Sequence, residues 1–103
     1  MVSVTEIIVR GQEAIERTIY KYFKDSKIEK ILFLPSEEDV KAKYIVGGWV
    51  GFVRVRNTWS GIIVVDGVQI PFVAEVHLNG KIDIYLYPSK DFYLAHLVGE
   101  LDG

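Results

Sequence analysis

An Asp-Gly pair between two apolar runs, at Asp66-Gly67, constrains the fold of this chain more than any other feature of its sequence. Asp-Gly is typical of a two-residue β-hairpin loop, because both central residues of that loop take positive φ. A loop of this kind places Val65 opposite Val68 and Ile63 opposite Ile70. The turn and the apolar pattern agree, and they predict an antiparallel hairpin with these side chains on one face.

A second turn is predicted at Leu78-Asn79-Gly80, where the loop length decides the register of the strands. A two-residue loop at Asn79-Gly80 would pair Val76 with Asp83 and mix apolar with charged side chains. A three-residue loop with Gly80 at positive φ pairs Val76 with Ile82 instead. We adopt this register, which extends the first face by Phe72, Ala74, Val76, Ile82, Ile84 and Leu86.

The segment Trp59-Ser60-Gly61 has the same form, a short loop that ends in glycine. We expect it to join a strand at Trp49–Asn57 to a strand that begins at Ile62, with Trp59 at the tip of the loop. The stretch from Trp49 to Tyr87 is thus predicted to form a four-stranded antiparallel meander.

The second face of this meander has an apolar part and a charged end. Its candidate interaction residues are Phe52, Arg54, Arg56, Ile62, Val64, Val73, Tyr85 and Tyr87. A solvated face would be mostly polar, and large apolar patches on soluble proteins mark contacts. We therefore expect a cover on this face, either a helix of the same chain or, as the preferred alternative, a second copy of the chain.

Helices are predicted before and after the meander. A capping box at Ser3-Val4-Thr5-Glu6 and an apolar stripe through Gly11 predict a helix from Val4 to Lys24 that approaches the sheet closely. A strand at Lys30–Leu34 and a short helix after Pro35 follow. A final helix is expected over Lys90–Leu101, with His96 packed or exposed on it.

The predicted fold is therefore a single α+β domain over residues 1–103. Its order is an N-terminal helix, one strand, a short helix, a four-stranded antiparallel meander and a C-terminal helix. No cofactor is indicated by any motif in the sequence.

Composition excludes several classes of protein. The chain has no cysteine, which excludes a disulfide framework and a thiolate metal site. No apolar run reaches the roughly 20 residues that cross a bilayer, and no secretory signal is recognised, so we expect a cytoplasmic protein with no membrane partner. The net charge of −2 provides no general attraction to nucleic acid. Scarce Met, Asn and Gln beside plentiful Ile, Val, Lys and Glu indicate a thermophilic source.

The charged end of the second face contains a candidate metal site. In the adopted register Glu75 lies opposite Asp83, about 5 Å away, and His77 follows two residues along. Two carboxylates and one imidazole are ligands for a divalent cation, and such a site would make the chain a metal-dependent hydrolase. The alternative, which we favour, is a solvated sheet end whose acids are balanced by Lys81 and by Arg54 and Arg56.

A second alternative is binding of single-stranded nucleic acid. Phe52, Tyr85 and Tyr87 would provide stacking surfaces for bases, and Arg54 and Arg56 would contact the backbone. Trp59 at its loop tip would add another stack. The acidic net charge favours instead a role for these aromatic residues in protein contacts.

The first hypothesis from the sequence is a small interaction protein without enzymatic activity. It is expected to be a homodimer, formed through the apolar sheet face, through the C-terminal helix or through both.

Overall fold

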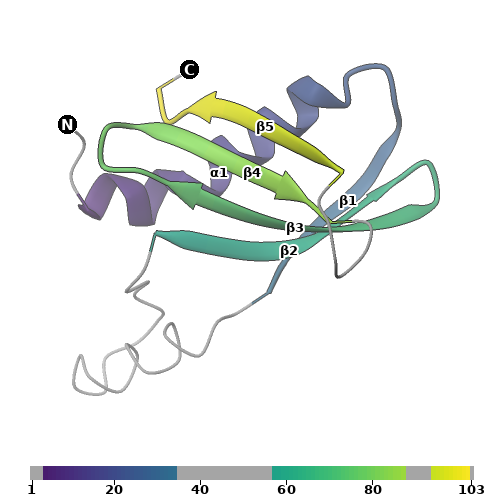
Figure 1. The fold of residues 1–103 in the computed structure, drawn as a ribbon, viewed down its shortest axis with the longest axis horizontal. Coiled ribbons are helices and arrows are strands. Elements are labelled where there is room, and N and C mark those ends of the chain that lie inside the picture. The colour runs from purple at the N-terminus through teal and green to yellow at the C-terminus, as the bar shows by residue number, and fades with distance from the viewer. Residues whose placement is uncertain (1–3, 35–56, 88–93, 103) are drawn as a thin grey trace.

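The computed structural model describes residues 4–34, 57–87 and 94–102, and in these ranges one helix packs on one antiparallel sheet (Figure 1). The elements are α1 (Val4–Tyr22), β1 (Ile28–Leu34), β2 (Thr58–Val65), β3 (Val68–Val76), β4 (Lys81–Leu86) and β5 (Ala95–Glu100). The strands lie side by side in chain order, from β1 at one edge to β5 at the other.

The hairpin at Asp66-Gly67 is confirmed. Asp66 has φ of 49° and Gly67 has φ of 78°, so both residues lie in the left-handed region that this loop requires. Val65 pairs with Val68, and Ile63 pairs with Ile70. The turn residues alone therefore fixed the register of β2 against β3.

The three-residue loop before β4 is also confirmed. Gly80 has φ of 89°, and Val76 pairs with Ile82 across the loop. The His77 N–H donates to the carbonyl oxygen of Lys81 at 2.8 Å, and the Gly80 N–H donates to that of His77 at 2.9 Å. This loop sets the faces of β3 and β4, and with them the position of every polar residue discussed below.

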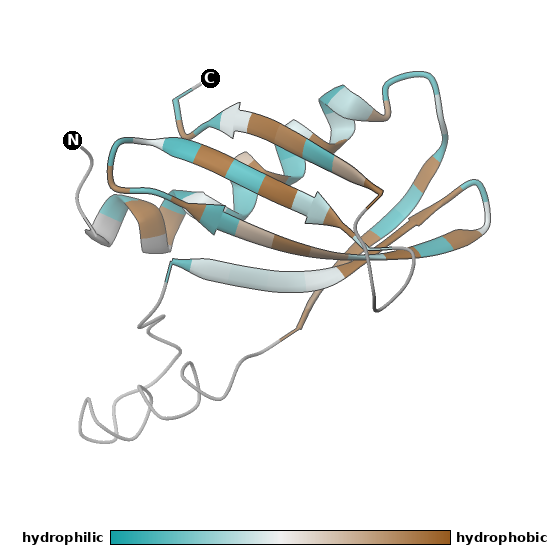
Figure 2. Ribbon diagram, viewed as in Figure 1, coloured by the Kyte–Doolittle hydropathy of each residue, from teal (hydrophilic) through white to brown (hydrophobic). Residues whose placement is uncertain are grey.

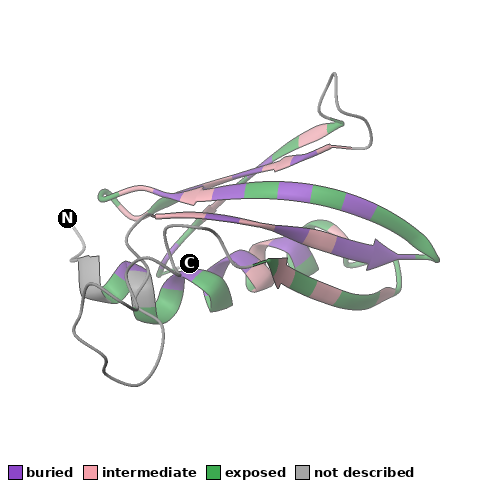
Figure 3. Cartoon of the chain, turned by 90° about the horizontal axis from the view of Figure 1, so that it is seen from below, coloured by how far each residue is buried: buried purple, intermediate pink, exposed green. Residues whose placement is uncertain are grey.

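The first face of the sheet forms the hydrophobic core against α1, and buried residues alternate with exposed ones along the strands (Figure 3). The hydropathy of the chain follows the same alternation (Figure 2). The helix contributes Ile7, Ala14, Ile15 and Ile19. The sheet contributes Trp59, Ile63, Val65, Ile70, Phe72, Ala74, Val76, Ile82, Ile84, Leu86 and Leu97. Burial of this apolar surface is the main force that holds the helix to the sheet.

The predicted N-terminal helix is confirmed, including the close approach at Gly11. A Cβ at this position would lie 2.5 Å from the Trp59 ring, so only glycine permits the contact. The predicted apolar stripe also includes Tyr22, the last residue of α1, and this side chain is 54% exposed. In Figure 1 the C-terminal end of α1 lies beyond β5 on the side away from β4, which explains the exposure of Tyr22.

The predicted turn at Trp59-Ser60-Gly61 is wrong, because these residues lie inside β2. Ser60 pairs with Leu34 of β1, and Trp59 is buried in the core at 4% exposure. Gly61 is needed for packing, since a Cβ there would collide with the carbonyl oxygen of Leu32 and approach the Phe72 ring. Glycine in a strand interior often marks such a close approach of another group.

The predicted layout with a C-terminal helix is also wrong, because Ala95–Glu100 forms the edge strand β5. Leu97 faces the core while His96 and Val98 are exposed, an alternation with the period of a strand. The free edge of β4 offers this segment a complete ladder of hydrogen bonds, whereas an isolated helix of this length is marginal. The sheet therefore has five described strands, and one helix is described.

Other parts of the predicted layout lie outside the described residues. These are the short helix after Pro35 and the strand Trp49–Asn57, of which the structure describes only the last residue, Asn57. The place expected for Trp49–Asn57, beside β2, is occupied by β1. The strand predicted at Lys30–Leu34 is confirmed, and it begins earlier, at Ile28.

The chain after β5 is fastened to α1 by two arginines. Arg10 donates to the carbonyl oxygen of Leu101 at 3.2 Å and pairs with the Asp102 carboxylate at 2.7 Å. Arg17 donates to the carbonyl oxygens of Glu100 and Leu101 at 3.2 and 3.0 Å. These contacts hold the C-terminal end of β5 against the helix.

Candidate functional site

The second face of the sheet carries the candidate interaction residues. Cross-strand pairing aligns one row through all the described strands: Leu34, Ser60, Val73, Tyr85 and His96. The neighbouring row contains Leu32, Ile62 and Pro71. Leu32, Leu34 and Val73 are 44%, 47% and 38% exposed, so large apolar side chains from β1 and β3 remain in contact with water. We call these two rows the apolar rows.

The residues predicted for this face are only partly exposed. Ile62, Tyr85 and Tyr87 are half-buried, and Val64 is buried at 8% exposure. Phe52, Arg54 and Arg56 lie outside the described residues. Leu32 and Leu34 were not among the predicted interaction residues, because the position of β1 in the sheet could not be read from the sequence.

Polar rows border the apolar rows at both ends. On one side, Lys30, Val64 and Gln69 form a row whose outer members are exposed. On the other side, Glu75 lies opposite Asp83, as predicted, and Asp83 lies opposite Val98. The second face thus has an apolar centre between polar margins.

Asp83 joins both histidines of the chain into one cluster. Its Oδ2 lies 2.6 Å from Nε2 of His77, and its Oδ1 lies 2.7 Å from Nε2 of His96. Each imidazole donates its Nε2–H to a separate carboxylate oxygen, which is the arrangement of a charge-assisted hydrogen bond. Residues from β4, β5 and the end of β3 are thereby linked on the second face.

The charge of Asp83 is stabilised by these bonds. Partial burial raises the pKa of Asp83, but the hydrogen bonds from His96 and His77 outweigh it, so the pKa is lowered from its ordinary value. The two histidines thus balance the charge of Asp83, a role that the sequence assigned to Lys81, Arg54 and Arg56.

Two further contacts surround the cluster. The ring of Tyr85 stacks on that of His96, with centroids 4.4 Å apart and an angle of 6° between the planes. Oε1 of Glu75 lies 3.8 Å from Nε2 of His77, too far for a hydrogen bond. Tyr85 thus fixes the orientation of His96, and one face of the Tyr85 ring is occupied.

The expectation that no metal ion binds at the cluster stays a prediction, and two observations bear on it. In the ranges 4–34, 57–87 and 94–102, no group of three or more His, Asp or Glu side chains is arranged to hold a metal ion. Glu75, His77 and Asp83 are near one another, as predicted, but both oxygens of Asp83 face imidazole nitrogens.

His96 is the member of the cluster that the sequence analysis missed. It was assigned to a helix, where it had no relation to Asp83. The residues Ala95–Glu100 alternate between buried and exposed positions, and this pattern would have placed His96 on the same face as Tyr85.

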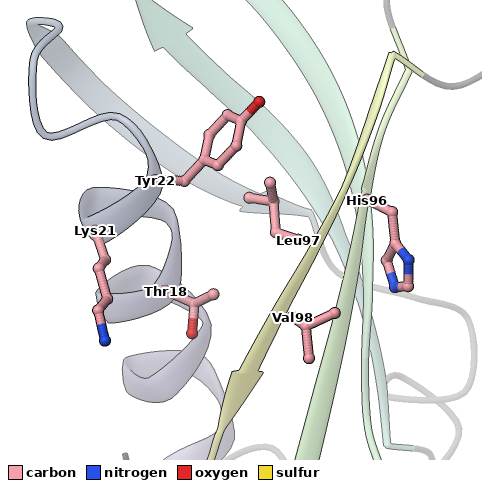
Figure 4. Close-up of a pocket in the computed structure, with 6 residues that line it drawn as sticks. All are labelled: Thr18, Lys21, Tyr22, His96, Leu97 and Val98. Carbon is pink, nitrogen blue, oxygen red and sulfur yellow. The ribbon is translucent and has the colours of Figure 1, made fainter.

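A pocket of about 260 Å³ lies between the C-terminal half of α1 and β5 (Figure 4). Thr18, Lys21 and Tyr22 line it from the helix, and His96, Leu97 and Val98 line it from the strand. It lies at the edge of the sheet and meets the apolar rows only at His96. We call it the edge groove.

In the described parts of the chain, no helix has the length and apolar character that crossing a membrane requires. The helix that is described, α1, has exposed charged side chains that include Glu6 and Glu13.

Comparison with known proteins gives relatives from viruses of Sulfolobus. The chain is 86% identical over 103 residues, the full length of both proteins, to the uncharacterized protein C-102b of Sulfolobus spindle-shape virus 1. It is 31% identical over 91 residues to the uncharacterized protein 91 of Sulfolobus islandicus rod-shaped virus 1, which covers 88% of this chain and 94% of that protein. No solved structure matches the chain. Residues 10–103 match the family of unknown function DUF5461, and the chain belongs to this family.

Proposed function

We propose that this protein is a non-catalytic interaction protein that pairs with a second copy of itself through the second face of its sheet. The observation that carries the proposal is the exposure of Leu32, Leu34 and Val73 at 38–47% on one face. Single exposed apolar residues are normal on a protein surface, but neighbouring ones in adjacent rows mark a contact site.

The distribution of side chains on this face fits an interface between proteins. Stable interfaces have an apolar centre and a polar, water-accessible margin. The apolar rows form such a centre, and the rows with Lys30 and Gln69 on one side and Glu75 and Asp83 on the other form the margin. Each Å² of apolar surface removed from water contributes about 25 cal/mol, so the exposed leucines and Val73 supply the driving force.

A second copy is the partner that we propose, because sheets pack well face to face. Two sheets stack about 10 Å apart with their strands within about 30° of each other, and their inward side chains interdigitate. In a symmetric pair the same surface serves on both copies, so the apolar rows of one copy cover those of the other.

The setting of the relatives supports two smaller parts of the proposal. Their viruses infect Sulfolobus, whose members are thermophilic archaea. We therefore propose that the protein works at high temperature in the cytoplasm of an infected cell. Dimerisation would add to its stability there, because binding of a partner to the folded state alone favours that state.

Binding of single-stranded nucleic acid has less support. Trp59 is buried in the core and offers no stacking surface, and His96 covers one face of the Tyr85 ring. The hypothesis now depends on Tyr87 and on Phe52, Arg54 and Arg56, which lie outside the described residues. If the wild-type protein slows the migration of a labelled single-stranded oligonucleotide in a gel, the nucleic-acid hypothesis would regain support.

The test of the proposal uses charge placed on the apolar rows. Leu34→Lys should give a monomer by light scattering, while the wild-type protein gives twice the chain mass, because a desolvated lysine opposes the contact. Val9→Lys is the matched control, since Val9 lies on α1 and is 71% exposed. A wild-type protein that stays monomeric at all concentrations, or a Leu34→Lys variant that stays dimeric, would contradict the proposal.

A further inference from the structure

The edge strand β5 has backbone groups that face away from the sheet. Leu101 donates its N–H to the carbonyl oxygen of Gly80. From there the pairing of β5 with β4 continues with Gly99 opposite Ile82 and Leu97 opposite Ile84. In an antiparallel ladder the hydrogen-bonding direction alternates from residue to residue. The N–H and C=O groups of His96 and Val98 therefore point away from β4, on the side of β5 where no further strand is described.

The edge groove lies directly beside these groups. Its floor is the buried Leu97, and its sides are Tyr22 and Val98, which are 54% and 64% exposed. One end is closed, because Thr18 packs so tightly on Gly99 that a Cβ on this glycine would collide with the threonine side chain. Arg17 covers the outward carbonyl of Glu100 at the same end. The groove is thus open along His96 and Val98 and stops at Gly99.

A positive charge stands at the rim of the groove. Arg10, Arg17 and Lys21 follow one another on the side of α1 that faces the end of the chain. The two arginines bind the carbonyl oxygens after β5, whereas Lys21 lines the groove and forms no ion pair with the described residues. Figure 4 shows Lys21 on the helix, farther from β5 than Thr18 and Tyr22.

The opposite edge of the sheet is protected. In β1 the register shifts between Ile28 and Lys30, and such a bulge disrupts the pairing of a further strand. The charged residues Glu29 and Lys30 are exposed at the same place, and Glu29 accepts a hydrogen bond from the N–H of Gly67 at 2.9 Å. The described part of β5 has neither a bulge nor a lysine or proline.

We propose that the edge groove binds an extended segment of a partner protein, which adds to β5 as a further strand and places an acidic side chain at Lys21. Addition of a strand to an exposed edge gives affinity through main-chain hydrogen bonds and specificity through alternate side chains. One face of the added segment packs over Tyr22 and Leu97, and the other lies beside His96 and Val98. Lys21 selects for the negative charge.

A single strand fits this place better than the β5 edge of a second copy. The C-terminal end of α1 extends beyond β5, so a symmetric copy would bring its own α1 into the same space (Figure 1). An extended segment brings no helix. This site shares only His96 with the apolar rows and uses the outward edge of β5, so the inference stands whether or not the proposed dimer forms.

The test uses two synthetic peptides, acetyl-Thr-Val-Thr-Asp-Thr-Val-Thr-amide and its counterpart with Lys at the central position, in which the central residue shares one face with both valines. Nuclear magnetic resonance titration should show shifts of the His96 and Val98 amides, slower exchange of these amides, and at least fivefold tighter binding of the Asp peptide. Lys21→Glu should reverse the preference. No binding of either peptide at millimolar concentration, or shifts confined to β1, β2 and β3, would overturn the inference.

A proline variant tests the backbone contact itself. Val98→Pro removes an N–H that points away from β4, and proline is tolerated on edge strands in that orientation. The variant should keep the fold and lose the peptide, whereas Val98→Thr should keep both. Unchanged binding to a folded Val98→Pro would overturn the inference. If Val98→Pro fails to fold, the inference is tested by whether Lys21→Glu reverses the preference between the Asp and Lys peptides. The Leu34→Lys variant should bind the Asp peptide normally, which separates this result from that of the dimer test.

Discussion

Nε2 of His96 lies 2.7 Å from Oδ1 of Asp83, a contact that ties the edge strand β5 to β4 through side chains as well as through the backbone. His77 holds the other oxygen of the same carboxylate at 2.6 Å. Because both bonds involve an ionised acceptor, each is stronger than a bond between neutral groups. The cluster therefore stabilises the margin of the second face and the edge of the sheet together.

Asp83→Asn should lower the free energy of unfolding by roughly 1 kcal/mol near neutral pH, because the charge that accepts both bonds is lost. Urea unfolding measures the difference. Asp25→Asn, at an exposed position after α1, is the matched control and should leave stability unchanged.

The effect of Asp83→Asn should also depend on pH. The folded-state pKa of Asp83 is lowered, so its contribution to stability is present above the unfolded pKa of about 3.9 and is lost as the pH falls through the folded value. The stabilities of the wild-type protein and the variant should therefore begin to converge below about pH 4 and meet below the folded-state pKa of Asp83. A difference that persists unchanged at pH 2 would show that the carboxylate charge is not the cause.

Gly80→Val should destabilise the fold by about 1 kcal/mol or more, because a β-branched residue resists the positive φ that this loop requires. Gly80 has φ of 89°. Thermal unfolding measures the loss, and Asn79→Ala, in the same loop, separates the φ requirement from the hydrogen bond of the Asn79 side chain to the Lys81 N–H. A neutral Gly80→Val would argue for another register of β3 and β4.

Gly99→Ala should cost about 1–3 kcal/mol, because the new methyl group overpacks the contact between β5 and α1. Its closest neighbour would be the side chain of Thr18. The double variant with Thr18→Ala should recover part of the loss, which is the signature of direct contact in a double-mutant cycle. Full additivity of the two substitutions would contradict the packing of β5 on the helix.

Addition of Mg²⁺ or Mn²⁺ should leave the melting temperature unchanged. Both oxygens of Asp83 are held by imidazoles, and Glu75 adds no third ligand in a suitable arrangement among the described residues. A bound ion would raise the melting temperature by mass action. A saturable micromolar response that is lost in Glu75→Ala would contradict this expectation and support the metal-dependent hydrolase.

The parts of the fold that the sequence predicted are those determined by local chemistry. Asp66-Gly67 and Gly80 need positive φ, and this need fixed two registers and the pairing of Glu75 with Asp83. The helix α1 was readable from its capping box and its apolar stripe. Each of these signals lies within a few residues of the structure that it specifies.

The predictions that were wrong concern parts of the fold that depend on contacts between residues far apart in the chain. Gly61 resembles a turn glycine, but its role is to admit the Leu32 carbonyl and the Phe72 ring, which only the assembled sheet shows. The apolar run around Leu97 is compatible with a helix or a strand, and the free edge of β4 decided for the strand. The cluster of His77, Asp83 and His96 was half predicted for the same reason, because one histidine comes from that strand.

The most direct test of the proposed dimer is a filtered nuclear Overhauser experiment on a mixture of isotopically labelled and unlabelled protein. This measurement detects only contacts between copies. It should show methyl groups of Leu32, Leu34 and Val73 in contact with the same set of residues on the partner, since these side chains form the exposed part of the apolar rows. Contacts between copies that involve only Val9, Tyr22 or other residues of α1, or no contacts at all, would contradict the account.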